Sequence, residues 1–146
     1  LFPYTTLFRS STTQTPSPLL PGAKTFLHQL EHHAVPAAVI SNDTRPGIEQ
    51  FLAHHQLTTL FQQNWSADDA PRKPDPEAVA QLCARLSLEP ANCALIGDAE
   101  TDLQMAVAAG VGVVVGYRGG WSSHPRLPSA HHVMDHWREL ALDVNP

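Results

Sequence analysis

Three polar clusters interrupt the apolar pattern of this sequence, and their side chains are of types that bind anions and hard cations. Ser41 and Asn42 directly follow one apolar run, Lys73 lies between prolines, and Asp98 and Asp102 follow a second apolar run. Hydroxyl, amide and ammonium groups can hold an anion, whereas carboxylates are ligands that Mg²⁺ prefers. Together these residues could therefore support chemistry on a negatively charged substrate.

Each cluster has a simpler explanation when it is considered alone. Ser, Asn and Asp are favoured after strands because they form turns and cap helices. An isolated lysine such as Lys73 is usually solvated on the surface. Asp98 could cap the next helix, with Asp102 complementing the dipole of its first turn. A functional interpretation therefore depends on the order and spacing of all three clusters.

That order and spacing resembles the haloacid dehalogenase-like phosphohydrolase superfamily. In this family one strand ends in Ser or Thr, often as Ser-Asn. A lysine follows, commonly in Lys-Pro-Asp-Pro, and a Gly-Asp-x-x-x-Asp segment comes after the next strand. The corresponding segments here are Ser41-Asn42, Lys73-Pro74-Asp75-Pro76 and 97–102. The resemblance covers roughly residues 19–140, and Leu20-Pro21-Gly22 is similar to the phosphoglycolate phosphatase-like branch.

The resemblance implies a Mg²⁺-dependent phosphatase that acts on a small phosphorylated metabolite through an aspartyl-phosphate. Asp98 would bind the cation directly, and Asp102 would act through water or a neighbouring ligand. Lys73 would place a compact positive charge near the phosphoryl oxygens and the nucleophile. Ser41 and the backbone near Asn42 would donate hydrogen bonds to the transferring group.

The sequence departs from the family pattern at the first motif. That motif, Asp-x-Asp-x-Thr, supplies the nucleophile and the acid/base residue, but the first acidic residue here is Glu31. We therefore expect a chain without the family's first strand and cap domain, inactive by itself. A non-catalytic phosphate- and metal-binding fragment, or a regulatory module, is the alternative function. Residues 1–18 are expected to be a linker or non-native leader, and residues 19–146 the partial core.

The elements that position these residues follow from the apolar pattern, which alternates between helix and strand. Such alternation predicts an α/β fold of Rossmann-like type, with a parallel sheet between two helical layers. The carboxyl ends of parallel strands form the ligand crevice of such folds. The expected strands are 35–40, 93–96, 112–115, 133–134 and a weaker one within 60–69. The expected helices surround 26–30, 48–52, 79–86, 103–109 and 137–142.

The missing family strand would be central in the sheet, beside the strand that precedes Ser41. Three outcomes are open: residues 1–8 fill the gap, the flanking strands close up, or the domain is only marginally stable, because unpaired backbone groups are costly.

Composition restricts the classes of partner and location. The net charge is −5, and the nine Lys and Arg are scattered, which argues against a nucleic-acid partner. We found neither an apolar run long enough to span a membrane nor a signal peptide, so a cytoplasmic location is expected. Cys83 and Cys93 lie in apolar stretches and suit a reduced core, and the three adjacent histidine pairs suit a surface role better than a zinc site.

Overall fold

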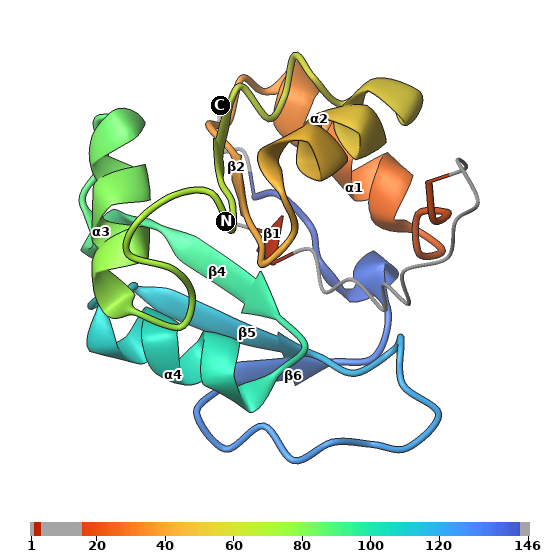
Figure 1. The fold of residues 1–146 in the computed structure, drawn as a ribbon. Helices are drawn as coiled ribbons and strands as arrows, with labels where there is room; N and C mark the ends of the chain where they lie inside the picture. The colour runs from red at the N-terminus through yellow and green to blue at the C-terminus, as the bar shows by residue number, and fades with distance from the viewer. Residues whose placement is uncertain (1, 4–15, 144–146) are drawn as a thin grey trace.

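Short strands and helices of nine or ten residues alternate along much of the chain in the computed structural model, which describes residues 2–3 and 16–143. In the carboxyl half, a long loop instead of a helix joins the last two strands (Figure 1). The helices are α1 (Ala23–His32), α2 (Arg45–His54), α3 (Pro76–Arg85) and α4 (Glu100–Ala108). The strands are β1 (Phe2–Pro3), β2 (Ala38–Ile40), β3 (Gln63–Trp65), β4 (Ala94–Gly97), β5 (Val113–Tyr117) and β6 (His132–Met134). Within the described part of the chain, no helix is both long and apolar enough to cross a membrane.

All paired strands run parallel and form two hydrogen-bonded sheets of three strands each. The strand orders are β1-β2-β3 and β4-β5-β6. Strand β1 also packs beside β4, so the two sheets meet between β1 and β4 (Figure 1). We call this junction the seam. The predicted parallel α/β architecture is thereby confirmed.

Strand β1 lies where the sequence predicts a missing central strand. Phe2 pairs with Val39 and Pro3 pairs with Ile40 in parallel register. Residues 2–3 thus pair with β2 at the expected gap, and the rest of the 1–8 segment lies outside the described residues. This strand has two residues and carries no carboxylate. The division of the chain at residue 18 stays a prediction.

The sheet is covered on both faces, because successive strand residues point to opposite sides. In β2, Ala38 and Ile40 pack into a core under α3 and α4, whereas Val39 packs into a second core under α1 and α2. In β4, Leu95 joins the first core and Ile96 packs in a third cluster on the other face. This alternation produces the three-layer arrangement that the sequence predicts.

Two predicted elements differ in extent. Strand β2 begins at Ala38 instead of residue 35, since Pro36 lacks the N–H that a sheet ladder needs. The helix expected over 137–142 is a single 3₁₀ turn, Trp137–Glu139, followed by extended backbone at Leu140. Leu140 and Leu142 both pack against the core under α1. Side chains two residues apart lie on the same face only when the backbone is extended. The packing of Leu140 and Leu142 therefore requires extended chain, and the helix prediction is wrong there.

Candidate active site

The loop between β3 and α3 positions Lys73 and is held at both ends. At its start, the indole Nε1 of Trp65 donates a hydrogen bond to the carbonyl oxygen of Pro71 at 2.7 Å. At its end, the Asp75 side chain accepts from the N–H of Glu77 at 2.9 Å and caps α3. Pro76 occupies the first turn of the helix, where its missing N–H costs nothing. The proline-rich segment is therefore a fixed non-helical loop that ends at a helix cap.

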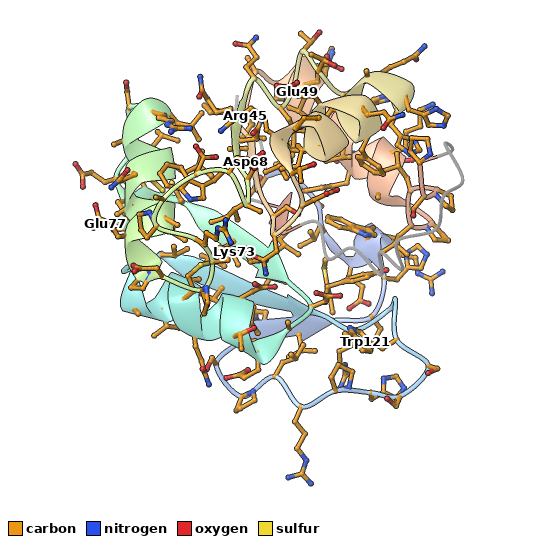
Figure 2. The ribbon with its side chains drawn as sticks, viewed as in Figure 1. Arg45, Glu49, Asp68, Lys73, Glu77 and Trp121 are labelled. Carbon is orange, nitrogen blue, oxygen red and sulfur yellow. The ribbon has the colours of Figure 1, made fainter. Side chains whose placement is uncertain are left out.

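Lys73 forms a buried ion pair with Asp102. Its Nζ lies 2.7 Å from Asp102 Oδ1, and the two side chains are only 7% and 4% exposed. Asp102 lies in the first turn of α4. Figure 2 shows Lys73 directed from its loop toward the end of β4. Charges buried this deeply persist only when they are paired, so the pair is a specific feature of the fold.

Asp98 follows β4 and completes this group of charges. Burial, and then the neighbouring charge of Asp102, raise the pKa of Asp98 to about 6. A backbone hydrogen bond and then the charge of Lys73 act in the opposite direction and lower the pKa. Lys73, Asp98 and Asp102 thus form one group of interacting charges, and we call them the acid–lysine cluster. A buried carboxyl with a perturbed pKa is typical of functional sites.

The donor atoms of the cluster fit Mg²⁺ only as part of a larger coordination sphere. Within residues 2–3 and 16–143, no group of three or more His, Cys, Asp and Glu converges to hold a metal ion. Mg²⁺ is, however, often bound by one or two carboxylates, with water and phosphate oxygens completing the octahedron. Asp98 is the direct candidate, because Asp102 already binds Lys73. A cation would also relieve the electrostatic cost of ionising Asp98.

Ser41 and Asn42 lie at the end of β2, as predicted, but the contacts of Ser41 run to the strand and turn beside it. The N–H of Ser41 donates to the carbonyl oxygen of Trp65 at 2.9 Å, and its Oγ accepts from the N–H of Asp43 at 3.1 Å. Ser41 is buried and Asn42 is exposed. Their predicted role toward a phosphoryl group stays a prediction.

A second set of charges, which sequence analysis missed, anchors the loop that carries Lys73. Asp69 accepts hydrogen bonds from the N–H and the hydroxyl of Ser66 at 2.7 and 3.0 Å. It also pairs with Arg45 at 2.5 Å and with Arg85 at 3.5 Å. Burial alone would raise the pKa of Asp69, but the Ser66 hydrogen bonds and the two arginines outweigh it and lower that pKa. The network joins the loop to α2 and α3.

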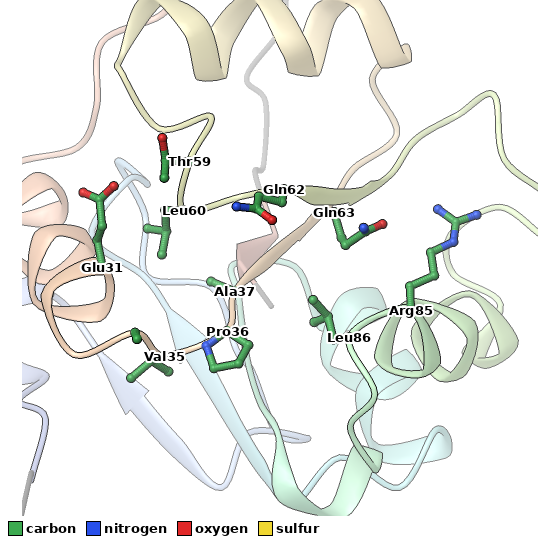
Figure 3. A pocket seen from close by; sticks show the side chains of 11 residues that line it. Glu31, Val35, Pro36, Ala37, Thr59, Leu60, Gln62, Gln63, Arg85 and Leu86 are labelled. Atoms are coloured by element: carbon green, nitrogen blue, oxygen red, sulfur yellow. The ribbon is translucent and has the colours of Figure 1, made fainter.

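A pocket of about 440 Å³ is lined by none of the residues of the acid–lysine cluster. Its lining includes Val35 before β2, Gln63 at the start of β3 and Arg85 at the end of α3 (Figure 3). It therefore opens at the amino ends of β2 and β3, whereas the acid–lysine cluster follows the carboxyl end of β4. None of the predicted site residues lines it.

Comparison with known proteins identifies the family to which this arrangement of residues belongs. The sequence model of haloacid dehalogenase-like hydrolases matches residues 4–115, which include Lys73, Asp98 and Asp102. The chain belongs to this family. The family resemblance expected from the three polar clusters is thereby confirmed.

Similar proteins include several phosphatases. A bifunctional riboflavin kinase/FMN phosphatase of Arabidopsis thaliana is 30% identical over 116 residues, which cover 78% of this chain and 28% of the relative. A phosphoglycolate phosphatase of Photorhabdus laumondii is 31% identical over 119 residues, covering 79% of this chain and 51% of the relative. The chain thus spans about half of the bacterial protein.

Solved structures agree with the fold. The crystal structure of a hydrolase of the same superfamily, subfamily IA, from Geobacter sulfurreducens superposes with a TM-score of 0.66 at 26% identity. The match covers 82% of this chain and 52% of that structure. The parallel α/β core is therefore shared with hydrolases of this superfamily.

Proposed function

We propose that this chain forms the phosphate- and Mg²⁺-binding part of a phosphatase that acts on a small phosphorylated metabolite. The observation that carries the proposal is the buried Lys73–Asp102 pair beside Asp98. Phosphatase names among the similar proteins support the same reaction class. The negative net charge and scattered basic residues support a small-molecule partner over nucleic acid. Two free thiols are consistent with a cytoplasmic location.

The residues of the cluster would manage the charge of the reacting group. A phosphomonoester carries up to two negative charges, and an attacking carboxylate adds a third. Lys73 would hold phosphoryl oxygens, while Asp102 keeps its ammonium group in place. Ser41 and the N–H near Asn42 would donate to the same oxygens. A bound Mg²⁺ would neutralise part of the developing charge, and Asp98 would bind it.

The proposed reaction proceeds through an aspartyl-phosphate, and the family's Asp-x-Asp-x-Thr motif, which supplies the nucleophile, has no match in this sequence. An aspartate oxygen attacks phosphorus while the P–O bond to the alcohol breaks, and a general acid gives the leaving oxygen its proton. Water then cleaves the acyl phosphate, which releases phosphate and restores the aspartate. No Asp or Glu precedes Glu31. The alternative function, binding of phosphate and metal without turnover, is favoured for this chain by the same observation.

Two measurements on the purified chain test the proposal. Calorimetric titration with orthophosphate in the presence of Mg²⁺ should detect binding that Asp98→Asn and Lys73→Ala both remove. Phosphate release from a panel of phosphomonoesters, with phosphoglycolate and FMN among them, should stay at background. Turnover that requires Mg²⁺ and is lost in Asp98→Asn would show that the chain is itself a phosphatase. Phosphate binding that survives both substitutions would exclude the proposed site.

A further inference from the structure

The side chain of Trp65 connects the hydrophobic core to the loop that carries Lys73. Trp65 is the last residue of β3, is only 2% exposed and packs in the core under α3 and α4. A buried indole needs a partner for its one N–H donor. Here the partner is the carbonyl oxygen of Pro71, which lies 2.7 Å from Nε1. A core side chain thus holds the loop backbone two residues before the proposed phosphate-binding lysine.

The backbone of Trp65 holds the other predicted phosphate-binding segment. Its carbonyl oxygen accepts a hydrogen bond from the N–H of Ser41 at 2.9 Å. This bond extends the parallel pairing of β2 and β3 one step beyond the Ile40–Trp65 pair. Ser41 is itself buried, so the end of the paired strands determines where it lies. One residue therefore contacts Ser41 through its backbone and the Lys73 loop through its side chain.

Arg85, at the end of α3, restrains the indole from a third direction. Its guanidinium carbon lies 4.5 Å from the centre of the Trp65 ring, which is a cation–π arrangement. The same guanidinium group donates to the carbonyl oxygen of Asn64 at 3.2 Å and lies 3.5 Å from Asp69. These contacts keep the guanidinium group over the ring. Core packing and α3 therefore set the direction in which the indole N–H points.

We propose that Trp65 is a positioning residue that sets the place of Lys73 relative to Ser41 at the proposed phosphate site. This inference rests on the proposed function, since it assumes that both residues hold phosphoryl oxygens. A lysine has a flexible four-carbon side chain, so the place of its ammonium group depends on how its backbone is held. The indole bond acts on that backbone, and Asp102 acts on the ammonium group. Without the indole bond, part of the free energy of phosphate binding would be lost in ordering Lys73.

Replacement of the indole N–H by sulfur separates the hydrogen bond from packing. Benzothienylalanine has nearly the shape of tryptophan but no N–H donor, and stop-codon suppression can insert it at position 65. Neutral hydrogen bonds commonly change an equilibrium constant about two- to tenfold. Calorimetry with orthophosphate and Mg²⁺ should therefore show affinity reduced by about that factor. The Trp65→Phe variant also lacks the donor and should lose at least as much.

The ammonium signal of Lys73 tests the positioning without phosphate. The sequence contains two lysines, and Lys24 on α1 is exposed whereas Lys73 is buried against Asp102. In protein labelled with ¹³C,¹⁵N-lysine, each ammonium nitrogen can be recorded through the carbon-bound protons beside it. Loss of the indole N–H should shift the Lys73 signal and speed exchange of its ammonium protons with water. The Lys24 signal is the internal control and should stay in place.

A variant elsewhere in the same core separates positioning from general loosening. Val114→Ala on β5 removes two methyl groups and should lower stability without moving the Lys73 signal. An equal shift in Val114→Ala would reduce Trp65 to a packing residue. If either the Lys73 signal or the phosphate affinity of the benzothienylalanine variant equals that of the wild type, Trp65 has no positioning role, and the proposed function still stands. Absence of phosphate binding in the wild type would overturn both.

Discussion

Lys73 Nζ lies 2.7 Å from Asp102 Oδ1, and the two side chains are almost fully buried. The lysine comes from the loop after β3 and the aspartate from the first turn of α4. Because burial removes the water that would otherwise solvate both groups, each charge depends on the other. The pair is therefore a structural element as well as part of the proposed site, and its removal has consequences for stability.

Replacing Lys73 alone should destabilise the protein strongly. Lys73→Met leaves the carboxylate of Asp102 buried without its cation, which costs about 3–5 kcal/mol in unfolding free energy. The double variant Lys73→Met/Asp102→Leu removes both charges and should lose much less. Urea unfolding measures the difference, with the exposed Lys24→Met as control. A double variant as unstable as the single one would mean that packing, not charge, explains the loss.

Asp98 should make stability depend on pH in the direction opposite to that of most aspartates. Burial, and then the charge of Asp102, raise its pKa from 3.8 to about 6 in the folded state. Between these two values the native protein holds a proton that the unfolded chain has released, so the free energy of unfolding falls as pH rises. Urea unfolding of the wild type should show this fall relative to Asp98→Asn. A difference between the two proteins that stays constant from pH 4 to pH 6 would contradict the shift.

Asp69 should contribute stability that disappears in acid. Its pKa is lowered because its Ser66 hydrogen bonds and the charges of Arg45 and Arg85 outweigh the effect of burial. The contribution is therefore complete above the pKa of the unfolded aspartate and is lost as pH falls through the folded value. At neutral pH, Asp69→Asn should cost about 1–3 kcal/mol in unfolding free energy, as charged hydrogen bonds do.

Hydrogen exchange can localise the effect of Asp69. Faster exchange in Asp69→Asn should concentrate in residues 66–75, the loop that carries Lys73. The exposed Glu49→Gln on α2 is the charge-matched control and should leave exchange of that loop unchanged. Equal stability of wild type and Asp69→Asn at neutral pH would show that the network is energetically neutral.

The two thiols should react at very different rates. Burial, and then the neighbouring Cys93, raise the pKa of Cys83 to about 12, and its sulfur lies 3.8 Å from that of Cys93. Because the thiolate is the reactive form, Cys83 should resist iodoacetamide at pH 8 while the partly exposed Cys93 is alkylated. Peptide mass spectrometry measures both sites. Unfolding in urea should make the two rates similar, and rapid labelling of Cys83 in the folded protein would refute its burial.

The sequence predicts those residues of the candidate site that belong to recognisable local motifs. Lys73, Asp98 and Asp102 can be recognised from the sequence because their order and spacing, after the Ser41-Asn42 segment, resemble the family motifs. Asp69 is different, since its importance comes from partners far away in sequence. Neither Arg45 nor Arg85 can be assigned to Asp69 from local spacing. Long-range pairing of this kind depends on how loops pack, which periodicity does not encode.

The seam between the two half-sheets determines how the proposed site would respond to strain. Lys73 belongs to the half built on β1-β2-β3, and Asp98 and Asp102 belong to the half built on β4-β5-β6. The Lys73–Asp102 ion pair therefore connects the two half-sheets across the seam, where β1 packs beside β4. If one half-sheet slid past the other, the distance between the Lys73 ammonium group and the two carboxylates would change. A substitution that widens the seam, even far from the cluster, would thus change the distances between Lys73 and both aspartates together.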